Sequence, residues 1–430
     1  MSVFATKQSS SMARKSLIGT GLGNALEWFD WQIYATFAPF IALQMFRSQD
    51  PISALLSTLA IFAVGFIARP FGGLLFGWIS DRHGRKVSLL LAIGLASIGS
   101  VIIAVIPSFT VIGNMASLLL LVARLIQGLA HGGEMPSAQT FLSESAPKEH
   151  RGLWSSIVYV SGTTGILLAT IIGAILTTFL PEQFMSQWGW RVPFLIAAIL
   201  GLYTLVLRTR LKETDSFAAA RSERADDRIS FWRQLIDNRI AVIKVVGLTL
   251  GFTVSFYVWA VTPPAYASEV LGMDTSSALW AGLVGNALFI ICLPLWGALS
   301  DRIGRKPVML IGLLGSAISY WPMNSIMTDK PWTLIVSMTV VLFFLSAVAA
   351  ISPAVYSELF PTGVRTLGTA LPYAFSVALF GGTAPYLQTW FASIGADWLF
   401  PTYAIVLLLI SAAVVLSLLE TRGIDLSKNS

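Results

Sequence analysis

Long apolar segments alternate with short polar ones along the whole chain. Their length, 18 residues or more, suits helices that cross a bilayer, for which about 20 apolar residues suffice. Strict alternation of apolar and polar residues, as in a membrane barrel, is absent, so the spans are helical. The predicted spans are 17–46, 54–79, 87–106, 115–142, 152–179, 190–207, 241–267, 276–299, 307–327, 332–356, 366–392 and 398–419. The pattern therefore predicts an all-α membrane protein with twelve transmembrane helices.

Composition agrees with a chain embedded in a lipid bilayer. Of its 430 residues 55% are hydrophobic and only 12% are charged, against about 25% charged in soluble domains. The net charge of +6 is not a nucleic-acid signal, because Lys and Arg gather in alternate loops. By the positive-inside rule these loops are cytoplasmic, which places both termini in the cytoplasm. One cysteine and three histidines predict no metal site.

The chain divides into two similar halves. The polar segment 208–240 separates residues 1–207 from 241–430 and is predicted to be a cytoplasmic linker. Residues 77–86 and 297–306 share Gly, Ser, Asp, Arg, Gly, Arg and Lys at equal spacing. A second repeat, of Glu, Pro and Arg, occupies 144–151 and 358–365. Such repeats indicate pseudo-symmetric six-helix halves with a substrate site between them.

Two helices carry polar residues on one face. In the fourth span, Arg124, Gln127, His131 and Glu134 are spaced by three or four residues and share a stripe. The first span has a similar stripe, with Gly23, Glu27, Asp30 and Tyr34. A charged residue near the bilayer centre costs roughly 2.5 kcal/mol or more, so these stripes cannot face lipid. We expect them to face a partner helix or an aqueous cavity.

Several motifs resemble the major facilitator superfamily. G-x-x-x-D-R-x-G-R-K follows the second span, and more specific strings are Gly23-Asn24-Ala25-Leu26-Glu27-Trp28-Phe29-Asp30, Arg69-Pro70-Phe71-Gly72, Gly132-Gly133-Glu134 and Glu358-Leu359-Phe360-Pro361. Together they are similar to the metabolite:proton symporter branch, whose members import organic acids or zwitterions. The resemblance implies the major facilitator fold, a bacterial inner membrane and adjacent first and fourth helices. A contact of Arg124 with Asp30 or Glu27 is therefore expected.

Residue type and position in the spans suggest roles for the polar residues. Proton coupling is expected from Glu27, Asp30, His131 and Glu134, and substrate binding from Tyr34, Arg69, Arg124, Gln127, Tyr257, Asn286 and Tyr373. Competing interpretations stay open. The charged pairs would also serve as permanent structural ion pairs, His131 as a satisfied core histidine, Glu134 as a brace for a neighbouring helix, and Arg69 as a tie to backbone carbonyls.

The repeated loop residues are expected to form a cytoplasmic gate. They are Asp81, Arg82, Gly84, Arg85, Glu144 and Arg151 in the first half, with Asp301, Arg302, Arg305, Glu358 and Arg365 in the second. An aspartate here would meet a helix N-terminus or an arginine across the interface between the halves.

The resulting hypothesis is a secondary active transporter that imports a small organic acid with protons by alternating access. The alternatives are a symporter of zwitterions such as proline or betaine, and an exporter or uncoupled facilitator on the same scaffold. An enzyme is not expected, because neither a nucleophile–base pair nor a phosphate-binding loop with lysine occurs. We expect no cofactor and a monomer whose partners are substrate, protons and lipid.

Overall fold

The structure is a computed structural model that describes residues 21–47, 50–83, 85–132, 139, 142–143, 146–209, 233, 236–361 and 364–426. Side chains of a few of these, including Asp81 and Arg85, lie outside the description. The described residues form helices and connecting turns, without a β-strand. The predicted linker, 208–240, lies largely outside the described residues.

The first half begins with a helix that runs without a break through Phe37. The N–H of Phe37 donates to the carbonyl of Ile33, and the N–H of Ile41 donates to that of Phe37. Residues 21–36 and α2 (Ala38–Met45) are therefore one helix, called the first helix below. After it come α3 (Pro51–His83), α4 (Arg85–Val105), α5 (Phe109–Ile112), α6 (Met115–Ala130), α8 (Arg151–Phe179), α9 (Glu182–Gln187), η1 (Gly189–Arg191) and α10 (Val192–Thr209).

The second half consists of α13 (Arg239–Phe256), η2 (Tyr257–Val261), α14 (Pro263–Glu269), α15 (Thr275–Ile303), α16 (Arg305–Ser325), α17 (Pro331–Glu358), α18 (Arg365–Ser376), η3 (Val377–Gly381), α19 (Ala384–Ser393) and α20 (Leu399–Leu416). Across the described residues, eight helices are long and apolar enough to span a membrane. The first helix, α6, α16 and the α18–η3–α19 unit complete the set. The prediction of an all-α, twelve-helix membrane protein is confirmed.

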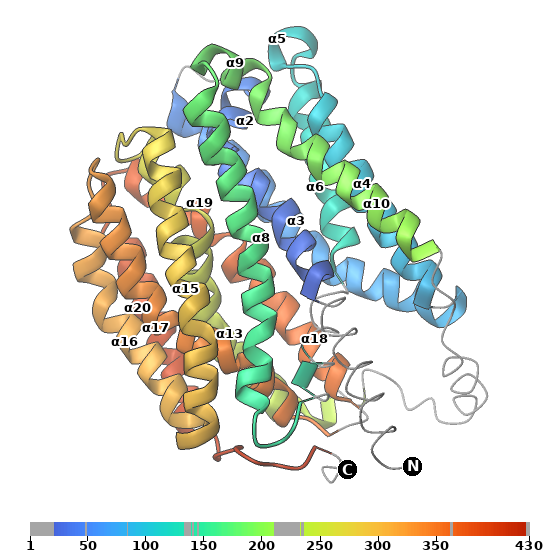
Figure 1. Ribbon diagram of the computed structural model, residues 1–430, viewed down its shortest axis with the longest axis vertical. Coiled ribbons are helices and arrows are strands. Elements are labelled where there is room, and N and C mark those ends of the chain that lie inside the picture. Colours follow the sequence, from blue (N-terminus) through green and yellow to red (C-terminus); the bar gives the residue numbers. More distant parts are fainter. Residues whose placement is uncertain are drawn as a thin grey trace.

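The two halves lie side by side. In Figure 1, α3, α4, α6 and α10 occupy one side of the molecule and α15, α16, α17 and α20 the other. Helix α8 of the first half packs along α15 of the second, which is the most extensive helix contact. At one end of this contact Gly152 and Gly297 face each other so closely that a Cβ on either would overlap the other's backbone. We call this end, where α8 begins and α15 ends, the gate end.

Three predicted spans differ in detail from the structure. In the fourth, predicted to continue to residue 142, α6 ends at Ala130 and residues 131–132 form a turn, while residues 139, 142 and 143 are again helical. The seventh and eleventh are each interrupted by a π-helical turn, η2 and η3. Such turns often occur at functional sites because they widen the helix and redirect side chains. Both π turns lie in the second half.

Candidate substrate and proton site

Asp30 of the first helix lies at the centre of a buried polar cluster in the first half. The hydroxyl of Ser100, from α4, donates to its Oδ1 over 2.5 Å. Its Oδ2 accepts from Nε2 of Gln127 over 3.0 Å, and Nε2 of His131 lies 3.2 Å from the same oxygen. Asp30 and His131 are 7% and 9% exposed. The carboxylate therefore has three partners drawn from two other helical elements.

Arg124 lies beside this cluster without a direct bond to Asp30. Its Nη1 donates to Oε1 of Gln127 over 2.9 Å, so the Gln127 amide joins the guanidinium to the carboxylate. The expected contacts of Arg124 with Asp30 or Glu27 do not occur among the described residues. The reason is geometric, because Gln127 lies one turn from Arg124 on α6 and fills the space between the two charges.

A second arginine approaches from α3. Nη2 of Arg69 lies 3.7 Å from Oε1 of Glu27, which makes a buried ion pair between α3 and the first helix. Both guanidinium groups share one aromatic ring, since the Cζ atoms of Arg69 and Arg124 each lie 4.0 Å from the centroid of Trp31. Cation–π contacts of this kind stabilise a desolvated arginine by about 2 kcal/mol.

The guanidinium donors are not all used. The Nε and Nη2 atoms of Arg124 and the Nε atom of Arg69 are buried without a hydrogen-bond acceptor in the described part of the chain. An arginine has five N–H donors and no acceptor. Leaving buried donors of a charged group unpaired is costly, so the cluster is poised to accept further oxygen atoms.

The second half closes this region with aromatic residues. Tyr257, at the start of η2, lies 5.0 Å from Phe66 and stacks on Trp28 at 6.2 Å between ring centroids. The hydroxyl of Tyr373 lies 3.5 Å from that of Tyr159 on α8. These tyrosines therefore contact the first half across the interface.

Two other predicted substrate residues bond to the backbone. The hydroxyl of Tyr34 donates to the carbonyl of Thr58 over 3.0 Å, and Nδ2 of Asn286 donates to that of Ala260 over 2.9 Å. Ala260 belongs to η2, so Asn286 supports the π turn. Glu134, predicted to couple protons, lies outside the described residues.

Sequence reasoning missed three residues of the site: Trp31, Ser100 and Gln32. Gln32 donates to the carbonyl of Val261 over 2.9 Å and so joins the two halves. A serine or an aromatic residue within an apolar span carries no signal that separates site from packing. Trp31 and Gln32 directly follow Asp30, and this position was their only mark in the sequence.

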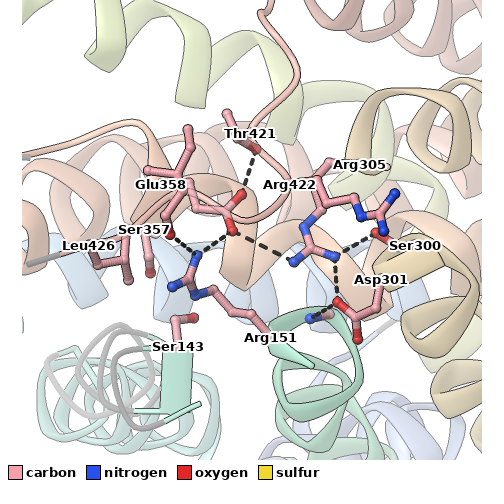
Figure 2. Close-up of polar contacts among 12 residues, drawn as sticks. Ser143, Arg151, Ser300, Asp301, Arg305, Ser357, Glu358, Thr421, Arg422 and Leu426 are labelled. Carbon is pink, nitrogen blue, oxygen red and sulfur yellow. Dashed lines mark hydrogen bonds and ion pairs between the residues drawn. The ribbon is translucent and has the colours of Figure 1, made fainter. Parts of the chain in front are cut away.

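At the gate end, four charged residues form a buried cluster that crosses the interface, shown in Figure 2. We call Arg151, Asp301, Arg305 and Glu358 the gate cluster. Nη1 of Arg151 lies 2.9 Å from Oε1 of Glu358, and Nη1 of Arg305 lies 2.7 Å from Oδ1 of Asp301. Nη2 of Arg305 also approaches Glu358, at 3.7 Å. Arg151 belongs to the first half and the other three to the second.

Asp301 also caps a helix of the opposite half. Its two carboxylate oxygens accept the N–H groups of Gly152 and Leu153, over 2.8 and 2.9 Å, in the first turn of α8. A carboxylate is favoured there because the first N–H groups of a helix lack partners and the helix dipole is positive. The predicted contact of this aspartate with a helix N-terminus is therefore present.

The other predicted gate residues are placed differently. Arg82 is exposed and lies over Trp78, with Cζ 4.6 Å from the ring centroid. The carbonyl of Arg302 accepts from Arg422. Arg365 donates to the carbonyls of Ser357 and Leu426, over 2.9 and 3.1 Å. Gly84 and Glu144 fall outside the described residues, as do the side chains of Asp81 and Arg85.

The fold and the site define a class: a two-halved helical membrane carrier with charged groups buried at and beside the interface. Family models match most of the chain, with "Sugar (and other) transporter" over residues 17–244 and "Major Facilitator Superfamily" over 245–429. The chain belongs to the major facilitator superfamily.

Named relatives and solved structures agree with this. The chain is 36% identical over 425 residues to the alpha-ketoglutarate permease of Escherichia coli K12, covering 97% of each protein. It is 33% identical to a putative proline/betaine transporter of Staphylococcus aureus, covering 95% of this chain and 88% of the relative. The structure of the proton:xylose symporter XylE matches with a TM-score of 0.77 at 19% identity, over 97% of this chain and 98% of the other. At that identity the last match concerns the fold alone.

Proposed function

We propose that the protein is a secondary active transporter that imports a small carboxylate metabolite together with protons. The observation that carries this proposal is the pair of buried guanidinium groups sharing Trp31, with donors left open beside Asp30. A carboxylate has the planar, bidentate geometry that arginine donors fit. The relative named alpha-ketoglutarate permease also points to an organic acid.

Charge balance gives a reason for coupling. When ionised, Glu27 and Asp30 match the two arginines, and the site is neutral with neutral His131. A substrate carboxylate that binds Arg124 adds a negative charge, which a proton on Asp30 offsets. Buried charges interact strongly because water does not screen them. Substrate and proton therefore favour each other's binding, and Gln127 links their two sites.

Alternating access requires the halves to separate first at one end and then at the other. The gate cluster supplies bonds that form only while the halves meet at the gate end. We assign this end to the cytoplasm because the loops there carry the clustered Lys and Arg residues. The chain then has both termini inside, in a bacterial inner membrane, and works as a monomer.

The test is uptake into proteoliposomes with and without an inward proton gradient. The panel holds α-ketoglutarate, citrate, shikimate, proline and glycine betaine. We expect wild-type protein to accumulate an acid only when an inward proton gradient is imposed. Asp30→Asn abolishes accumulation but keeps exchange of substrate across the membrane. Accumulation that ignores the gradient would identify a facilitator, and loss of exchange in Asp30→Asn would show that Asp30 is needed for more than coupling.

Arginine variants test the substrate class. Arg124→Lys keeps the charge but loses the fork of donors, and a charge-assisted hydrogen bond contributes about 1.5–3 kcal/mol. We expect the KM for the acid to rise about 10- to 100-fold. Arg191→Lys is the matched control, because Arg191 is also buried and lies over a tryptophan, Trp190, but belongs to η1 outside the site. Transport of betaine and of no acid would favour the zwitterion symporter.

A further inference from the structure

A pocket within the first half is lined in part by Asp30 and His131 of the proposed proton site. Its walls come from the first helix, α4, α10 and the end of α6, and the described residues that line it all belong to the first half. It therefore lies apart from the interface where the substrate site is expected. The polar lining residues are Glu27, Asp30, Ser97, Ser100, His131 and Thr204.

The pocket combines titratable groups with space for water. Among the lining residues, Glu27, Asp30 and His131 are the titratable ones, while α4 and α10 contribute hydroxyl and apolar side chains. The cavity volume is about 70 Å³. One water occupies roughly 10–15 Å³ of cavity, so the pocket has room for several waters. The hydroxyls and carboxylates supply the polar partners that such waters require.

The pocket extends from Asp30 toward the gate end. Gly23, in the first described turn of the first helix, and Thr204, near the end of α10, both line it. Asn24, next to Gly23, donates to the carbonyl of Val158 near the start of α8, whereas Thr36 lies against Gly173 farther along α8, so Gly23 lies on the gate side of Asp30. Helix α10 runs antiparallel to α4, with Arg191 at Ala104 and Gly201 at Ser97, so Thr204 lies toward the start of α4. The gate cluster itself lies elsewhere, between α8, α15, α16 and α17.

We propose that this pocket is a proton port: a water-filled route, confined to the first half, by which Asp30 exchanges its proton with the cytoplasm. The proposal rests on the proposed function. Substrate leaves between the halves when the gate cluster opens, whereas the proton leaves between the first helix, α4 and α10. Gln127 is bonded to both Asp30 and Arg124. It therefore links the protonation of Asp30, on the proton route, to the binding of substrate at Arg124, on the substrate route.

Filling the port tests the proposal. Ala96 lines the pocket from α4, and Ala96→Leu adds three carbon atoms to it. The matched control is Gly94→Val, which adds three carbon atoms to the same helix outside the lining, at a position where a Cβ meets nothing within 4 Å. The probe is the panel acid that wild-type protein accumulates fastest. We expect Ala96→Leu to slow gradient-driven net uptake at least 10-fold while exchange stays within 2-fold, because exchange needs no proton release. Gly94→Val leaves both rates unchanged.

Chemical modification of a cysteine at the same position tests the port without relying on the folding of Ala96→Leu. In a Cys292→Ser background, Ala96→Cys is treated with methyl methanethiosulfonate and then with dithiothreitol. Modification should slow net uptake and leave exchange intact, and reduction should restore uptake. Equal losses in both assays, no loss of net uptake, or a thiol at position 96 that does not react would overturn the port. Wild-type uptake independent of the gradient would instead overturn the proposed function, and the port with it.

Discussion

At the gate end, Glu358 forms a deeply buried ion pair with Arg151, which we expect to hold this end closed. Its side chain is 0% exposed and that of Arg151 is 4% exposed, with 2.9 Å between the charged atoms. Glu358→Gln keeps the shape of the side chain and removes its charge. In the closed state, Arg151 and Arg305 then lose a carboxylate partner while they remain buried away from water. In the open state water reaches both guanidinium groups, so the penalty is confined to the closed state.

Because the penalty applies to the closed state alone, it shifts the equilibrium between the closed and open gate by its full size. Breaking a buried pair by removing one partner costs about 3–5 kcal/mol. Each 1.4 kcal/mol is a factor of ten, so the equilibrium between closed and open gate shifts about 100-fold to several thousand-fold toward open. Uptake from outside then falls, because it needs the closed gate, while binding from the cytoplasmic side persists.

Spin labels at His83 and Ile303 report the opening directly. The two exposed positions are equivalent in the repeated loops and lie in opposite halves. With Cys292 replaced by serine, double electron–electron resonance should show the distance distribution move to longer values in Glu358→Gln. The matched control is Glu149→Gln, whose carboxylate is 62% exposed and lies 3.9 Å from Lys148.

An exposed pair of this kind contributes about 1 kcal/mol at most. Glu149→Gln should therefore keep the wild-type distances. An unchanged distribution in Glu358→Gln would refute the assignment of the cluster as a gate. A shift of similar size in both variants would show that general charge, not the buried pair, sets the equilibrium.

Two further outcomes are expected from the packing of the first half. Gly128→Ala should destabilise the protein by about 1–3 kcal/mol and lower its Tm in detergent, because the added methyl would overlap the carbonyl oxygen of Gly65. Gly94→Ala, where a Cβ meets nothing within 4 Å, should leave the Tm unchanged, and equal effects would contradict this packing. Trp31→Leu removes the ring shared by the two guanidinium groups. Since such contacts contribute about 0.5–2 kcal/mol each, the KM for the acid should rise about 10-fold. An unaltered KM in uptake kinetics would show that Trp31 does not support substrate binding.

The twelve spans and the polar stripes could be predicted because their causes are local. Apolar length decides whether a helix can cross the bilayer. The cost of exposing charge to lipid decides that Asp30, Gln127 and His131 turn inward together, as they do in the structure. Neither argument needs to know which helices are neighbours.

The partners of those residues could not be predicted in the same way. Which donor reaches Asp30 first depends on the rotation and vertical offset of three helices, and sequence spacing contains neither. Gln127 and Ser100 therefore take positions that were expected for Arg124. The π turns, over Tyr257–Val261 and Val377–Gly381, were likewise not predicted from the helical pattern. Proline and glycine lie close to both turns, with Pro263 two residues after the first and Gly382 directly after the second.

The contacts of the repeated motifs could not be predicted from their sequence either, and the two copies differ in a way that matters for transport. Arg151 and Arg365 occupy equivalent positions in the two halves, and both are buried. Arg151 crosses the interface to Glu358, whereas Arg365 bonds to carbonyls within its own half. The ion pair of Arg151 with Glu358 must break when the gate end opens, while the bonds of Arg365 to Ser357 and Leu426 can persist through the cycle. Among the described residues, the two equivalent arginines therefore differ in one bond: that of Arg151 to Glu358 joins the halves and has to break in the transport cycle, whereas those of Arg365 to Ser357 and Leu426 join residues of one half.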